Sequence, residues 1–204
     1  MRLVVPLALL ALPLAAQNPG RHARLEGRVP AGALPVIDSL VARAVAESLP
    51  TEPLVQKALE GGAKRISTSR IVNAVRRALL QLENARGLLT QAAPDQPAGD
   101  TALYAVAAAL GRGLAPGVVR QIVVGLPGQP PGPPLHAVAD LVAHRFDPDS
   151  AAALIVEAGR RGLQGMRLLD VANAAVHELQ RGRTRAEALA RVREAVTRGT
   201  LPGS

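Results

Sequence analysis

The sequence contains no cysteine and is very poor in aromatic residues. The absence of cysteine excludes disulfides, thiolate metal sites, a cysteine nucleophile and a lipid-modified cysteine after a signal sequence. It does not distinguish one cellular compartment from another. Tyr104 and Phe146 are the only aromatic residues, so the chain offers almost none of the aromatic side chains on which single-stranded nucleic acids stack.

Lysine is also scarce. Lys57 and Lys64 are the only two, so arginine carries almost all of the net charge of +8. A basic surface can bind nucleic acid or anionic lipid, but acidic residues are interspersed here and a solvated surface explains the pattern better. We therefore expect no nucleic-acid partner. Weak contact with an anionic membrane surface stays as an alternative, with these candidate residues: Arg76, Arg77, Arg160 and Arg161.

Residues 1–16 have the pattern of a signal peptide, with a charged start and then an apolar run. The run is shorter than the roughly 20 apolar residues of a membrane-spanning helix, and Pro6 and Pro13 argue against a helix of the core. We expect cleavage after Ala16, export, and a location in the periplasm. Residues 17–33 show no sustained period, so we expect a mobile lead there.

The segment from Leu49 to Leu82 has the pattern of a helix, a tight turn and a second helix, and this pattern recurs twice. The copies align when Ile66 is matched with Leu114 and Leu163. Five residues after these positions stands an apolar set, Ile71, Val119 and Leu168, and five residues before them stands a small set, Gly61, Ala109 and Ala158. Small residues let another backbone approach closely. The agreement is typical of a repeated helix pair.

The turns of the second and third copies contain Gly113 and Gly162 where a helix end favours a left-handed residue. The first copy has Arg65 at the corresponding position. Because a left-handed conformation strains an arginine modestly, we expect the first helix to end earlier, at Gly61 and Gly62.

The whole pattern predicts an all-α fold, an array of short helix-turn-helix repeats in two units. The first unit is expected at 34–90, a linker at 91–99 and the second unit at 100–204. A proline-rich spacer at 125–134 interrupts the second unit, because this density of proline favours an extended polyproline conformation. Residues 118–124 are rich in β-branched side chains and fit a strand or a short helix, and the alignment of the copies favours the helix.

One group of side chains suggests chemistry. His136, Asp140 and His144 are spaced four residues apart, which places them on one polar face of a predicted helix. Imidazole and carboxylate groups at this spacing can hold a divalent metal. We favour an ordinary polar face, because the sequence identifies no ligand from another helix and the neighbouring Arg145 repels a cation. We predict no catalytic residue and no cofactor.

The stretch PLVQKALEGGAKRISTSRI, residues 53–71, resembles segments of uncharacterised exported bacterial all-helical proteins. Those segments carry Pro-Leu, Lys-Ala-Leu-Glu-Gly and a later Arg-Ile. The resemblance covers roughly a tenth of the chain. It implies a shared helical unit and no activity.

Together these features predict a non-catalytic interaction or structural protein of the cell envelope, with a protein partner or self-association, because arrays of helix pairs commonly form binding surfaces. Two alternatives remain open. One is a metal-dependent enzyme or metal-binding protein that uses His136, Asp140 and His144. The other is a binder of polyanions or anionic lipid that uses the four arginines named above.

Overall fold

The computed structural model describes residues 19–94 and 98–200. Within these ranges the chain is all-α, with ten α-helices, a single turn of 3-10 helix and no strand, which confirms the predicted fold class. The predicted signal peptide, residues 1–16, lies outside the described residues. Among the described helices, none combines the length and the apolar character that crossing a bilayer requires.

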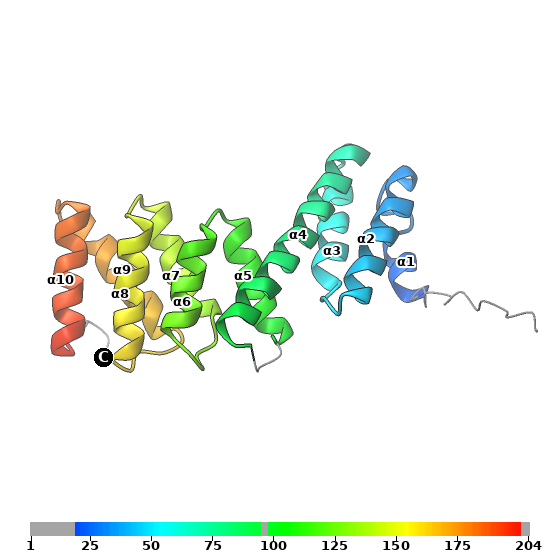
Figure 1. The fold of residues 1–204 in the computed structure, drawn as a ribbon. Helices are drawn as coiled ribbons and strands as arrows, with labels where there is room; N and C mark the ends of the chain where they lie inside the picture. The colour runs from blue at the N-terminus through cyan, green and yellow to red at the C-terminus, as the bar shows by residue number, and fades with distance from the viewer. Residues whose placement is uncertain (1–18, 95–97, 201–204) are drawn as a thin grey trace, which may run out of the picture. The chain divides into compact units, whose positions relative to one another are not determined.

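The helices follow one another with short connections (Figure 1). A 3-10 turn at Ala31–Ala33 precedes the second helix. The α-helices, in chain order, are α1 (Pro19–Leu25), α2 (Leu34–Ala46), α3 (Glu52–Ala63), α4 (Thr68–Ala92), α5 (Asp100–Gly111), α6 (Pro116–Gly125), α7 (Gly132–Ala143), α8 (Pro148–Arg160), α9 (Arg167–Gln180) and α10 (Arg185–Arg198).

The chain divides into two compact units, and the division falls inside α4, between Val75 and Arg76. The sequence pattern had suggested a change of unit at 91–99. Helix α4 runs through the division without interruption because its apolar stripe continues through both parts. The buried members of this stripe are Ile71, Val75, Leu79 and Leu82.

The first unit is built on α3, which contacts both α1 and α2. Leu25 at the end of α1 and Val29 in the following turn are buried. The expectation of a mobile lead is therefore wrong for residues 19–33, which form α1 and the 3-10 turn. The physical reason is that these two apolar side chains reach the core although the segment has no helical period.

Helix α3 continues through the two glycines at which we expected it to end. It runs to Ala63, and Arg65 adopts the left-handed conformation with φ of 50°. The glycines serve packing instead. A Cβ at Gly61 would lie 2.7 Å from Cγ1 of Ile71, and one at Gly62 would collide with the carbonyl oxygen of Arg28. Backbone-to-backbone approach thus accounts for glycine here.

The turns expected after α5 and α8 are confirmed. Gly113 and Gly162 have φ of 91° and 93°. The amide of Leu114 donates to the carbonyl of Ala109 at 3.1 Å, and in the third copy Leu163 and Ala158 make the same bond at 3.1 Å. In the first copy Ile66 donates to Gly61 at 3.2 Å, so all three turns use one hydrogen-bond pattern that closes a helix end.

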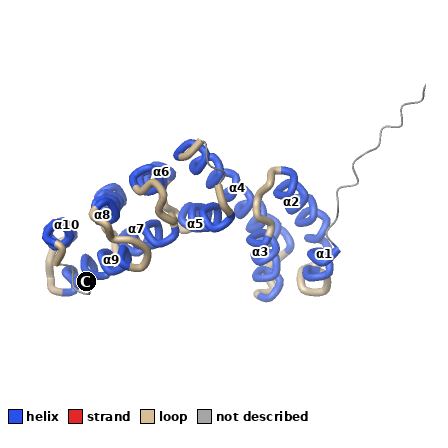
Figure 2. The backbone as a smooth tube through the Cα atoms, turned by 90° about the horizontal axis from the view of Figure 1, so that it is seen from below, coloured by secondary structure: helices blue, strands red, loops and turns tan. Residues whose placement is uncertain are grey.

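The second unit arranges its later helices in two layers (Figure 2). Helices α5, α7 and α9 are neighbours in one layer, and α6, α8 and α10 are neighbours in the other. Helix α8 packs against α6, α7, α9 and α10. It is accordingly the most buried helix, and Leu154 and Ile155 have no exposed surface.

Two segments of the second unit, residues 118–124 and 125–134, can now be compared with the expectations from the sequence. Residues 118–124 lie in α6 and are helical. The expectation of an extended spacer at 125–134 is wrong, because Leu126 is buried, the Nε2 of Gln129 donates to the carbonyl of Gly159 at 3.3 Å, and α7 already begins at Gly132. Proline is compatible with the first turn of a helix, so a proline-rich stretch can open α7.

Candidate interaction surface

The predicted metal ligands are only partly brought together. On α7 the Nε2 of His136 lies 3.5 Å from Oδ1 of Asp140, and both side chains are about half exposed. His144 caps the end of α7, and its carbonyl accepts a hydrogen bond from Nε of Arg185 at 3.0 Å. Within residues 19–94 and 98–200, no group of three or more His, Asp or Glu side chains is close enough to hold a metal. The pair alone supplies too few protein ligands for the usual metal centre.

A groove of about 910 Å³ runs between α6 and α8 on the second unit. Its walls come from the outward faces of these two neighbouring helices. The residues that line it are Gly117, Arg120, Gln121, Val124 and Gly125 from α6, and Ala153, Val156, Glu157, Arg160 and Arg161 from α8 and its end. The groove thus combines small and aliphatic side chains with a group of three arginines.

The apolar part of the groove depends on a close approach of the two helices. A Cβ at Gly125 would lie only 2.8 Å from each methyl group of Val156, so the glycine lets α6 come near α8. Val124, next to it, is 54% exposed. An aliphatic side chain is therefore presented to solvent inside the groove.

The charged part of the groove carries more positive than negative charge. The Nε of Arg160 donates to the carbonyl of Gly125 at 3.2 Å, which ties its side chain to the end of α6. Arg161 and Arg193 share Glu157, with N–O distances of 3.4 Å and 3.2 Å. In the part of the chain that the structure describes, neither Arg160 nor Arg120 is paired with a carboxylate. Two guanidinium groups therefore remain without an acidic partner.

The four arginines expected to bind anions do not form one cluster at this groove. Arg160 and Arg161 line it, whereas Arg76 and Arg77 lie on α4 and are not among its residues. The sequence interpretation missed Arg120 and Val124. A signal was present, because these two residues are four apart on α6 and an aliphatic side chain on the same helical face as an arginine is out of step with the apolar stripe.

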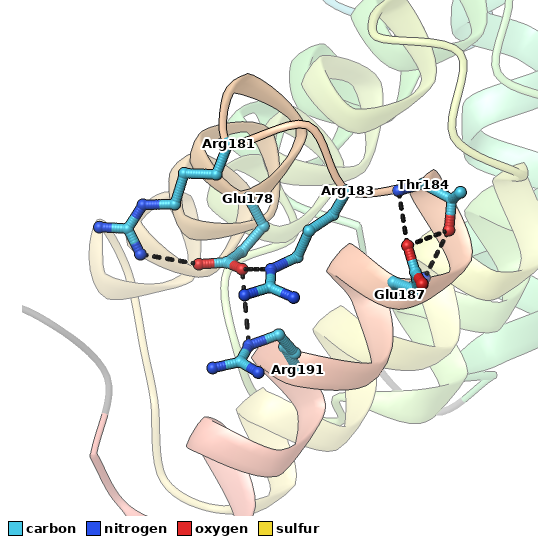
Figure 3. A network of polar contacts seen from close by, with 6 residues as sticks. All are labelled: Glu178, Arg181, Arg183, Thr184, Glu187 and Arg191. Carbon is cyan, nitrogen blue, oxygen red and sulfur yellow. Dashed lines mark hydrogen bonds and ion pairs between the residues drawn. The ribbon is translucent and has the colours of Figure 1, made fainter.

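A second polar cluster joins α9 to α10 (Figure 3). The side chain of Glu178 is only 14% exposed, and it pairs with Arg181 at 3.1 Å, with Arg183, and with Arg191 at 3.6 Å. Desolvation acts to raise the pKa of Glu178, but the hydrogen bond from Arg183 and the three positive charges outweigh it and hold the pKa below its ordinary value. Glu178 is therefore ionised and links two helices, which makes it unsuitable as a general acid.

Beside this cluster, α10 begins with a reciprocal cap that Figure 3 also shows. The backbone amide of Glu187 donates to Oγ1 of Thr184 at 3.3 Å, and the amide of Thr184 donates to Oε2 of Glu187 at 2.9 Å. These bonds satisfy amides that a helix start otherwise leaves unpaired. The cap fixes where α10 starts and carries no sign of a ligand site.

No protein-family model, curated protein or solved structure matches the chain. The functional interpretation therefore depends on the two-layer packing of the second unit and on the groove between α6 and α8. The groove offers one exposed aliphatic side chain, Val124, and two arginines without a carboxylate partner, Arg120 and Arg160.

Proposed function

We propose that the protein is exported and acts as a non-catalytic helical interaction protein of the cell envelope, which binds a protein partner through the groove between α6 and α8. The observation that carries this proposal is the combination of an exposed aliphatic side chain, Val124, with two arginines that have no carboxylate partner. Arginine is one of the residue types that contribute most to protein–protein binding.

The surroundings of the groove support a binding role. The two helices that form it pack against each other, and α8 also packs against α7, α9 and α10. A surface that is formed before binding costs less conformational entropy on binding. The tight pairing of Gly125 with Val156 fixes the spacing of the two walls. Stacked arrays of helices also present binding surfaces in many unrelated proteins.

Affinity capture from extracts of the native cell envelope tests the binding role. We expect the chain to recover a specific protein, and the double variant Arg120→Glu with Arg160→Glu to recover much less of it. The matched control is Arg112→Glu with Arg167→Glu, two exposed arginines outside the groove with the same change of charge. Circular dichroism should give the same helicity for all three proteins. Equal capture by the groove variant, or no specific partner and no self-association in ultracentrifugation, would contradict the proposal.

Export is tested separately by the intact mass of protein recovered from the native cell. The proposal expects a chain that begins at Gln17 and is found in the periplasmic fraction. A cytosolic protein that retains residues 1–16 would contradict the envelope assignment, whatever the capture experiment shows.

A further inference from the structure

We infer that the partner segment in the α6–α8 groove is acidic, with carboxylates placed around an aliphatic side chain. This inference rests on the proposed binding role and adds the chemistry of the partner. Its basis is charge complementarity, because the groove presents Arg120 and Arg160 without carboxylate partners and is also lined by an exposed valine, Val124.

The positions of the two arginines favour carboxylate groups as the ligands. The Nε of Arg160 is already used by the carbonyl of Gly125, so its two terminal nitrogens are the donors left for a ligand. Arg120 has all of its donors available in the described part of the chain. Guanidinium groups bind carboxylates through paired, charge-assisted hydrogen bonds that are both strong and directional.

The single acidic residue of the groove does not cancel this charge. Glu157 is shared by Arg161 and Arg193, and its hydroxyl neighbour Thr197 also donates to it at 3.4 Å. An incoming carboxylate therefore finds two cations without a carboxylate partner, Arg120 on α6 and Arg160 at the end of α8. An acidic partner gains two ion pairs, whereas a basic partner meets unscreened like charge, which opposes its binding.

The exposed side chain of Val124 favours a peptide over a purely ionic ligand. Its exposed surface gains nothing from a soluble polyanion, but it is covered when an aliphatic side chain of a peptide lies between the two bound carboxylates. A groove of about 910 Å³ accommodates a short stretch of backbone with its side chains. We therefore assign the groove to an acidic, partly apolar peptide segment in preference to a lipid headgroup.

The test is selection of a displayed library of random 16-residue peptides on the full chain, followed by binding measurements with the enriched peptides. We expect a shared pattern of two or more Asp or Glu residues around an aliphatic residue. Binding should weaken about tenfold or more with Arg120→Glu plus Arg160→Glu, stay within about twofold with Arg112→Glu plus Arg167→Glu, and weaken about fivefold with Val124→Ser. Raised salt should weaken the parent complex.

A charge exchange keeps the test independent of folding. Peptides whose acidic residues are replaced by lysine should bind the Arg120→Glu plus Arg160→Glu variant better than they bind the parent chain. The inference would be overturned if the enriched peptides were neutral or basic, if they bound the groove variant as well as the parent chain, or if no peptide were enriched. The proposed binding role would survive any of these results if envelope capture still depended on the groove. The inference would be overturned in favour of a lipid ligand if vesicles of phosphatidylglycerol and phosphatidylcholine displaced the peptides from the parent chain and did not bind the groove variant.

Discussion

At the scale of single residues, the helix ends place different residue types in the same left-handed conformation. Arg65 has φ of 50°, and Gly113 and Gly162 have φ of 91° and 93° in equivalent turns. A side chain with a Cβ is less stable in this region than glycine. The turn pattern of hydrogen bonds is therefore kept in the first copy at the cost of local strain.

Replacing Arg65 by glycine should increase the free energy of unfolding by about 1 kcal/mol, because the strain of the left-handed arginine is removed. The reverse change, Gly113→Ala, should lower it by about 1 kcal/mol, since no neighbouring atom lies within 4 Å of a Cβ there and only the backbone conformation opposes it. Urea unfolding followed by circular dichroism measures both. Arg65→Ala is the control, because it removes the charge and keeps the strain. A gain equal to that of glycine would assign the effect to charge.

The ion pairs of α3 predict a dependence of stability on pH. Glu60 accepts hydrogen bonds from Lys57 at 2.8 Å and from Lys64 at 2.5 Å, and these two bonds and charges lower its pKa from 4.5 to about 2. A lowered pKa in the folded state means that the contribution of Glu60 is present above pH 4.5 and is lost as the pH falls towards about 2.

We therefore expect Glu60→Gln to be less stable than the parent chain at pH 7 and the gap between them to close between pH 4.5 and about 2. Urea denaturation at several pH values across this window measures it. The gap should also narrow at high salt, because the three side chains are well exposed and their attraction is screened. A gap that stays constant down to pH 2 would show that the carboxylate charge is not responsible.

At the scale of helices, two glycines with the same secondary structure should respond in opposite ways to alanine. Gly62 in α3 has no room for a Cβ, because the backbone oxygen of Arg28 occupies that place, and backbone cannot move aside as a flexible side chain can. Gly87 in α4 has open space around it. We expect Gly62→Ala to lower the free energy of unfolding by about 1–3 kcal/mol and Gly87→Ala to raise it by about 0.5–1 kcal/mol, the gain in helix propensity.

Thermal and urea unfolding measure this pair of variants. Equal effects of the two alanines would mean that the segment around Arg28 does not pack against α3. Hydrogen exchange measures the local effect. Gly62→Ala should lower the protection of backbone amides around Leu25 and Val29, which are buried in the first unit.

At the scale of the whole molecule, the two units have separate sets of buried side chains, although α4 contributes residues to both. Leu54→Ala and Leu154→Ala remove fully buried side chains from the first and the second unit, and each should cost about 2–5 kcal/mol. We expect each variant to lower hydrogen-exchange protection in its own unit, with the change in α4 confined to one side of the division at residues 75 and 76. Loss of protection throughout the chain with either variant would mean that the units unfold together.

The sequence predicts much of this architecture because helical periods and glycine turns are local signals. The buried positions Ile71, Val119 and Leu168, and the turns at Gly113 and Gly162, follow directly from spacing. The sequence does not predict the packing of residues 19–33, because Leu25 and Val29 are too few to form a period. The prolines near the start of α7 also led to the wrong prediction of an extended spacer. Whether such a stretch is extended or packed depends on Leu126 reaching the core.

The groove was harder to predict than the helices, because it belongs to two helices that are not consecutive in the chain and have α7 between them. Arg120 and Arg160 show no relation in the sequence, and their common place becomes evident only when α6 lies beside α8. The three residues spaced as metal ligands show the opposite case. A shared helix was sufficient to suggest the site, but His144 belongs to the cap of α7.

The two lysines on either side of Glu60 also make the chain selectively addressable by amine chemistry. Lys57 and Lys64 are the only lysines of the sequence, and both are exposed on the first unit. Succinimide esters or aldehyde resins will therefore couple to α3, its end and the terminal amine, and leave every arginine of the α6–α8 groove chemically intact. Binding measurements on a chain attached in this way therefore use a groove whose side chains are unmodified.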